Sequence, residues 1–152
     1  MSTNPDLFTT VIPQYGIRLV QEQILQGPII SGPEAAADVA CQFLKDKDRE
    51  YFIAIFLATN SRVCGLSVCH IGSINASIVR VADSMKAAIL ANAAAVIYAH
   101  NHPSGNLEPS GEDLVVTSKL VEAGRLMDIP VRDHIIVVPS GEFTSFSRRG
   151  LL

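Results

Sequence analysis

The chain has 152 residues, of which 48% are hydrophobic and 18% are charged, and its formal net charge is −3. This length predicts one domain with a substantial hydrophobic core, and the composition excludes an intrinsically disordered chain. The acidic balance argues against a general nucleic-acid-binding surface, because binding phosphates requires an excess of lysine and arginine.

The cysteines and the apolar stretches indicate the setting of the protein. Cys41, Cys64 and Cys69 are too few and too scattered for a disulfide framework, which favours a reducing compartment. The first residues contain no basic segment that leads into an apolar run, so no signal peptide is expected. The longest nearly apolar stretch, 87–99, is shorter than the roughly 18 to 20 residues needed to span a bilayer. We therefore expect a soluble, cytoplasmic protein with no membrane partner.

The N-terminal region lacks the periodicity of a packed element. Residues 1–16 contain two prolines and a glycine without a repeating apolar pattern, which predicts a flexible arm. Residues 17–25 alternate weakly and predict an edge strand. We therefore expect the folded domain to cover 17–152.

The next segments predict a helix followed by a hairpin. Ser31 and Glu34 have the spacing of a capping box with proline in the first turn, so a helix should run to about Lys45. The run 51–57 is apolar at every position, as in a central strand that is covered on both faces. A short turn separates it from 63–71, which predicts its hairpin partner.

The second half of the chain alternates between helical and extended patterns. The alanine-rich segment 81–92 predicts a helix, and 93–100 predicts a strand. A longer helix is expected over 110–127, followed by strands over 135–138 and 143–146 around a Pro/Gly turn. This order predicts one α/β domain with a mixed β-sheet that is flanked by helices on both faces.

Two histidines stand at the end of the strand predicted over 93–100. Residues at i and i+2 of an extended chain project from the same face, so His100 and His102 can converge on one point. The Pro/Gly loop that follows can return the chain so that Asp113 supplies a carboxylate oxygen to the same point. Three nitrogen and oxygen ligands with one open position are typical of catalytic zinc.

The same residues have a simpler interpretation. Each histidine could be an ordinary polar residue at a strand end, although the pair together favours a metal site. Ser110 and Asp113 also have the spacing of a helix cap, in which Ser110 accepts a backbone N–H and Asp113 favours the positive end of the helix dipole. Spacing alone favours capping and ligation about equally for Asp113, and Ser110 could cap and still direct its hydroxyl at the site.

Other candidates are weaker. Glu50 precedes the central strand at the rim of the sheet, where a carboxylate could take a proton from water in a hydrolytic site, but composition alone does not select it. Asp133 and His134 could support such a site or lie on the surface, and we expect the surface. Cys64 and Cys69 project from opposite faces of one strand, so we expect buried apolar cysteines and no shared metal.

These motifs together resemble a known family. Glu50 followed by an apolar strand, His-x-His-Pro at 100–103 and Ser-x-x-Asp at 110–113 resemble the JAMM motif of JAB/MPN metalloprotease domains. Within that group, His-Asn-His-Pro-Ser-Gly resembles the RadC branch, and the resemblance covers roughly residues 30 to 150. It implies a cytidine-deaminase-like JAB/MPN fold.

The resemblance also implies roles for the motif residues. His100, His102 and Asp113 would be ligands of Zn²⁺, Glu50 would be the general acid and base, and Ser110 would donate a hydrogen bond to the tetrahedral intermediate. The implied activity is zinc-dependent hydrolysis of a peptide or isopeptide bond in a peptide or protein substrate.

The RadC branch also carries a DNA-repair label. The alternative is therefore a DNA-repair or mobile-element accessory protein whose metal site is not catalytic. Longer RadC proteins have an N-terminal helix-hairpin-helix region, which the first 30 residues are too short to hold. Direct DNA binding is disfavoured by the net charge. A zinc nucleoside deaminase would need His-x-Glu and Pro-Cys-x-x-Cys motifs, and the sequence contains neither.

Overall fold

The computed structural model describes residues 27–75 and 77–152. The expected arm over 1–16 and the expected edge strand over 17–25 lie outside the described residues. Helices and strands follow one another in this order: α1 (Pro33–Leu44), β1 (Tyr51–Leu57), β2 (Val63–Ile71), α2 (Val81–Leu90), β3 (Ala95–Asn101), α3 (Gly111–Leu126), β4 (Val131–Val137) and β5 (Phe143–Ser145).

The strands form one mixed sheet with the order β2-β1-β3-β4-β5. β1 is antiparallel to both β2 and β3, whereas β3 and β4 are parallel. β5 returns antiparallel to β4 after a short turn. The α/β class and the mixed sheet predicted from the sequence are confirmed.

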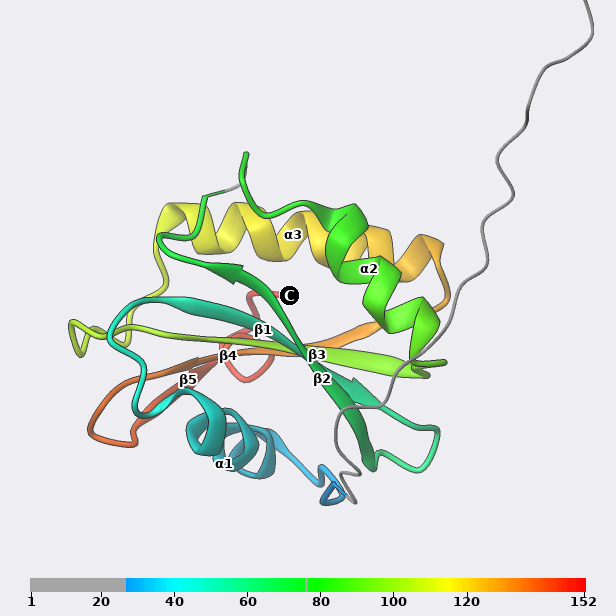
Figure 1. Ribbon diagram of the computed structural model, residues 1–152, viewed down its shortest axis with the longest axis horizontal. Coiled ribbons are helices and arrows are strands. Elements are labelled where there is room, and N and C mark those ends of the chain that lie inside the picture. Colours follow the sequence, from blue (N-terminus) through cyan, green and yellow to red (C-terminus); the bar gives the residue numbers. More distant parts are fainter. Residues whose placement is uncertain (1–26, 76) are drawn as a thin grey trace, which may run out of the picture.

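Helices cover both faces of this sheet, with α1 on one side and α2 and α3 on the other (Figure 1). Alternate residues of a strand point to opposite faces, so β1 contributes to two apolar clusters. Ile53, Ile55 and Leu57 pack with α1, and the intervening side chains pack with α2 and α3. This explains why β1 is apolar at every position.

Three local expectations are wrong. α1 is N-capped by Gly32 and has no side-chain cap hydrogen bond, so Ser31 does not form a capping box. β4 begins at Val131, so Asp133 and His134 lie inside a strand and are buried, not on the surface. Cys64 is exposed, which contradicts the buried cysteine expected there.

The sheet brings distant segments together at one end of its central strands. Because β1 and β3 are antiparallel, the start of β1 lies beside the end of β3, and Phe52 pairs with His100. The loop that leaves β3 continues directly into α3. The described helices include none that is long and apolar enough to cross a bilayer.

Candidate metal centre

His100 and His102 form the centre of the site. His100 is the penultimate residue of β3, His102 follows the strand, and the two Nε2 atoms are 2.9 Å apart. His100 is fully buried and His102 is 8% exposed. The i, i+2 convergence expected for this pair is therefore present.

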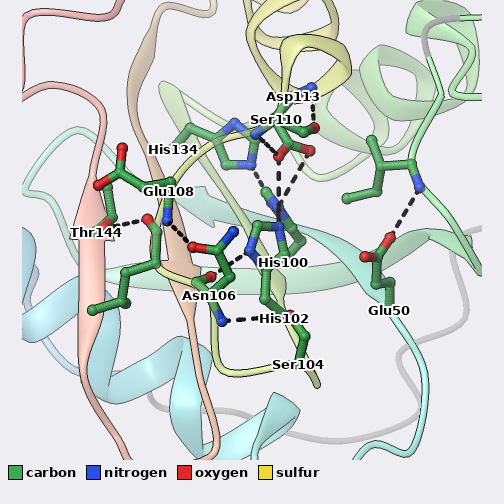
Figure 2. A network of polar contacts seen from close by, with 12 residues as sticks. Glu50, His100, His102, Ser104, Asn106, Glu108, Ser110, Asp113, His134 and Thr144 are labelled. Carbon is green, nitrogen blue, oxygen red and sulfur yellow. Dashed lines mark hydrogen bonds and ion pairs between the residues drawn. The ribbon is translucent and has the colours of Figure 1, made fainter.

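Asp113 approaches the histidines from the first turn of α3. Its Oδ1 atom is 3.4 Å from Nε2 of His100, and its Oδ2 atom is 3.5 Å from Nε2 of His102. The same side chain completes a capping box, because Asp113 Oδ2 accepts a hydrogen bond from Ser110 N at 2.7 Å while Ser110 Oγ accepts one from Asp113 N at 3.1 Å. The capping and the site-facing interpretations of Asp113 are thus compatible (Figure 2).

The donor atoms suit a divalent cation. One ligand atom from each of His100, His102 and Asp113 lies within 4.8 Å of the others, and the three residues are buried. His102 Nδ1 lies 2.6 Å from the backbone oxygen of Asn106. A carbonyl oxygen only accepts hydrogen bonds, so in the neutral ring the proton is on Nδ1 and Nε2 presents a lone pair to the site. This group could hold a metal ion.

Charges within the site shift its ionisation. Burial lowers the pKa of His100, and the neighbouring Asp113 only partly offsets this effect. The adjacent Asp113 carboxylate favours the protonated ring and raises the pKa of His102. Burial acts to raise the pKa of Asp113, but His100, His102 and Ser110 together hold it well below its usual range. Asp113 is therefore an ionised carboxylate at neutral pH, as a metal ligand must be.

Glu50 lies across the mouth of the site. It immediately precedes β1, is half-buried, and lines an open cleft together with His102, Ser110 and Asp113. Its Oε2 atom accepts a hydrogen bond from the backbone N–H of Ile74 at 3.1 Å, which holds the carboxylate beside the cluster (Figure 2). The structure thus brings Glu50 and Ser110 to the cleft that His102 and Asp113 also line.

Comparison with known proteins identifies the family. A family model described as RadC-like JAB domain matches residues 30–151. The chain belongs to this family. The resemblance stated from the motifs is therefore confirmed.

Relatives of this RadC-like JAB domain are named UPF0758 protein. One from Roseiflexus castenholzii is 45% identical over 122 residues, which are 80% of this chain and 52% of the relative. One from Shouchella clausii is 41% identical over 137 residues, or 90% and 59% of the two chains. One from Desulforamulus reducens is 42% identical over 124 residues, or 82% and 54%. The chain thus spans little more than half the length of these curated relatives.

Sequence reasoning missed the side chains that support the cluster. His134 lies 2.7 Å from His100 between ring nitrogens and contacts Thr117 at 2.6 Å on its other side. His134 is 34 positions from His100 and 17 positions from Thr117 in the chain, so no local sequence pattern joins these residues. The available signal was a histidine directly before the apolar run 135–138, but parallel pairing with β3 was needed to place it behind the site.

Asn101 was missed for a different reason. It stands between the two histidines, so its side chain projects from the opposite face of β3. Its Oδ1 accepts a hydrogen bond from Tyr51 N at 2.7 Å, and its Nδ2 donates one to the backbone oxygen of Arg49 at 2.9 Å. The two partners are the neighbours of Glu50 in the chain, so Asn101 ties the histidine-bearing strand to the segment that carries Glu50.

Proposed function

We propose that this RadC-like JAB domain is a zinc-dependent metallopeptidase that hydrolyses a peptide or isopeptide bond. The observation that supports the proposal is the convergence of His100, His102 and Asp113 beside a cleft that Glu50 lines together with His102 and Asp113. Two imidazoles and one carboxylate are a ligand set of catalytic zinc sites, whereas structural zinc sites are closed by four ligands. The described cysteines lie outside this group.

His100, His102 and Asp113 would hold the ion. When bound, zinc acts as a Lewis acid that makes water acidic at neutral pH and polarises a carbonyl group. The three side chains are buried, so little reorientation is needed before an ion binds. The capping hydrogen bond from Ser110 N also fixes Asp113 against rotation.

Glu50 would move the proton of the reaction. Its carboxylate accepts a proton from the attacking water as the oxygen bonds to the carbonyl carbon, and then delivers that proton to the leaving nitrogen as the C–N bond breaks. The hydrogen bond from Ile74 N leaves the other carboxylate oxygen of Glu50 available for this exchange. Positioned acid–base groups of this kind contribute about 100-fold to 10,000-fold in rate.

Ser110 would stabilise the developing oxyanion. Its Oγ accepts the N–H of Asp113, so the hydroxyl proton remains available for donation into the cleft. Loss of one such donor typically costs about 100-fold or more in rate. Ser110 is exposed to solvent at the cleft, as contact with a substrate requires.

The experiment uses the zinc-loaded chain and two substrate libraries. One is a mixture of proteome-derived peptides, and the other is a set of peptides joined through lysine isopeptide bonds; new amine termini are detected by mass spectrometry. Glu50→Gln removes the base, and Glu142→Gln, on the exposed β4–β5 turn, is the matched carboxylate control.

We expect cleavage by the wild type and by Glu142→Gln, and a rate at least about 100-fold lower for Glu50→Gln with zinc still bound. Full activity of zinc-loaded Glu50→Gln would show that the base is assigned wrongly. No cleavage of either library by the zinc-loaded wild type would contradict the peptidase assignment.

A further inference from the structure

A series of buried hydrogen bonds runs behind the candidate metal centre. His100 Nδ1 lies 2.7 Å from His134 Nε2, and His134 Nδ1 lies 2.6 Å from Thr117 Oγ1. Thr117 Oγ1 in turn donates to the backbone oxygen of Asp113 at 2.6 Å. His100 and His134 are fully buried and Thr117 is 1% exposed, so water does not compete for these contacts. The series therefore begins at the backbone of one candidate ligand and ends at the ring of another. Figure 2 shows its last contact, between His134 and His100.

The direction of each hydrogen bond follows from the number of protons. The hydroxyl of Thr117 has one proton, and the carbonyl of Asp113 can only accept, so that proton points to Asp113. Thr117 Oγ1 must then act as the acceptor toward His134, and Nδ1 of His134 must carry a proton.

The surroundings of His134 favour a neutral ring. Its ring stacks on Phe146 at a centroid distance of 4.5 Å and meets the edge of Phe52 at 5.4 Å. Its two nitrogens contact an imidazole and a hydroxyl, and an unpaired charge in such an apolar position is strongly disfavoured. The single ring proton is therefore on Nδ1, and Nε2 of His134 accepts a hydrogen bond.

The final contact determines the state of His100. Because Nε2 of His134 accepts, Nδ1 of His100 must donate. A neutral His100 with its proton on Nδ1 presents the lone pair of Nε2 to His102 and Asp113. His102 likewise directs an Nδ1 proton at the backbone oxygen of Asn106, so with an ion bound both Nε2 atoms would present lone pairs to it.

We propose that Thr117 and His134 are positioning residues that fix the tautomer of His100, so that its Nε2 atom is prepared to bind the metal. The inference rests on the metal site of the proposed function and concerns metal affinity, not hydrolysis. Mutation of a side chain that orients a histidine ligand in this way typically lowers metal affinity or activity by about 10-fold to 100-fold. Neither residue contacts the cleft, and each acts through His100.

The variants separate loss of the hydrogen bond from loss of volume. Thr117→Val keeps the shape of the side chain and removes the hydroxyl, whereas Thr117→Ser keeps the hydroxyl and is the matched control. His134→Leu removes the acceptor toward His100, whereas His134→Gln places an amide oxygen near the position of Nε2. Circular dichroism identifies the folded variants.

The first readout is the tautomer of His100 in metal-free, ¹⁵N-labelled protein, taken from the imidazole nitrogen chemical shifts. We expect the proton on Nδ1 in the wild type, Thr117→Ser and His134→Gln. In Thr117→Val, His134 loses its acceptor and can turn its proton toward His100, which should populate the form of His100 protonated on Nε2. His134→Leu should give a mixture of the two forms.

The second readout is zinc affinity, measured by competition with a chromophoric chelator. We expect zinc binding to be about 10-fold to 100-fold weaker in Thr117→Val and His134→Leu than in the wild type, and close to the wild-type value in the two conservative variants. If folded Thr117→Val keeps the wild-type tautomer of His100 and the wild-type zinc affinity, the proposal is overturned. This test holds even if His134→Leu fails to fold. Neither readout requires peptidase activity, so a failure of the proposed hydrolysis is distinguishable.

Discussion

Backbone groups orient several of the side chains at the candidate site. His102 is fixed by the carbonyl of Asn106, Glu50 by the N–H of Ile74, and Asp113 by the N–H of Ser110. Backbone partners of this kind persist when neighbouring side chains change, because every residue supplies a carbonyl and every residue except proline an N–H. At the scale of single residues, the site therefore depends on the path of two loops as much as on its own side chains.

Ser110 should have separable structural and chemical roles. Ser110→Ala removes the cap of α3 and should lower the free energy of unfolding by about 1 kcal/mol, and it should also slow hydrolysis. Ser110→Asp restores the cap, because aspartate caps helices as well as serine does, but its carboxylate cannot donate to an oxyanion. Urea unfolding and peptide hydrolysis measure the two effects, with Ser110→Thr as the control that keeps both. Full activity in Ser110→Asp would remove the hydroxyl from the mechanism.

Asn101 should affect the position of Glu50 more than it affects the affinity for zinc. Asn101→Leu leaves the N–H of Tyr51 and the carbonyl of Arg49 without their partner, so the segment that carries Glu50 loses its attachment to β3. Because the Asn101 side chain faces away from His100 and His102, we expect hydrolysis to fall while zinc affinity stays within a few-fold of the wild type.

Zinc competition and hydrolysis rates on the same preparation check this separation. Asn101→Asp keeps the acceptor for Tyr51 N and loses the donor, so it should show an intermediate rate. A loss of zinc affinity as large as the loss of rate would contradict the assignment of Asn101 to Glu50.

At the scale of elements, the sequence predicts the features that depend on the spacing of residues close together in the chain. The unbroken apolar run of β1 indicated a central strand, and the His-x-His pair indicated two imidazoles on one face. β4 was less predictable, because Asp133 and His134 are polar residues that usually lie on the surface. Asp133 is buried because Ser145 and Ser147 donate hydrogen bonds to its carboxylate. His134 is buried because the parallel register beside β3 brings it to His100, and Thr117 contacts its other ring nitrogen. Contacts of that kind join distant segments and leave no local pattern.

α2 is attached to β3 by one buried polar contact. Ser84 Oγ and the hydroxyl of Tyr98 are 2.5 Å apart, and both residues are fully buried. Burial also raises the pKa of the Tyr98 phenol, so it stays protonated and neutral over the physiological range.

Removing both partners of this contact should cost less than the sum of the two single removals. Ser84→Ala leaves the Tyr98 hydroxyl buried without this partner and should lower the free energy of unfolding by about 1–3 kcal/mol. Tyr98→Phe in the same background removes the unsatisfied hydroxyl, so the double variant should be less destabilised than the sum of the single variants. Urea unfolding of the four proteins measures the coupling. Strict additivity would mean that the contact does not hold α2 to the sheet.

At the scale of the whole molecule, several surface cations are paired with carboxylates. Among the described residues, exposed ion pairs with carboxylates engage Arg49, Arg80, Lys86, Arg148 and Arg149. Each such pair contributes little to stability, but together they neutralise cationic groups that would otherwise be available to phosphates. The net charge of −3 likewise disfavours the binding of phosphates by the full chain.

We therefore predict that this chain has no phosphate-driven affinity for DNA. Fluorescence anisotropy with a labelled duplex, repeated between about 50 mM and 200 mM salt, measures this directly. A tight complex that weakens steeply with salt would contradict the prediction and would favour the DNA-repair or mobile-element alternative.

The central claim is that His100, His102 and Asp113 bind one zinc ion. The most direct measurement is the metal content of protein purified after zinc loading and desalting, compared between the wild type, His102→Ala and the control His70→Ala, whose histidine lies on β2 outside the cluster. We predict one zinc per chain in the wild type and in His70→Ala, and almost none in His102→Ala. Equal zinc in the wild type and His102→Ala would contradict the account.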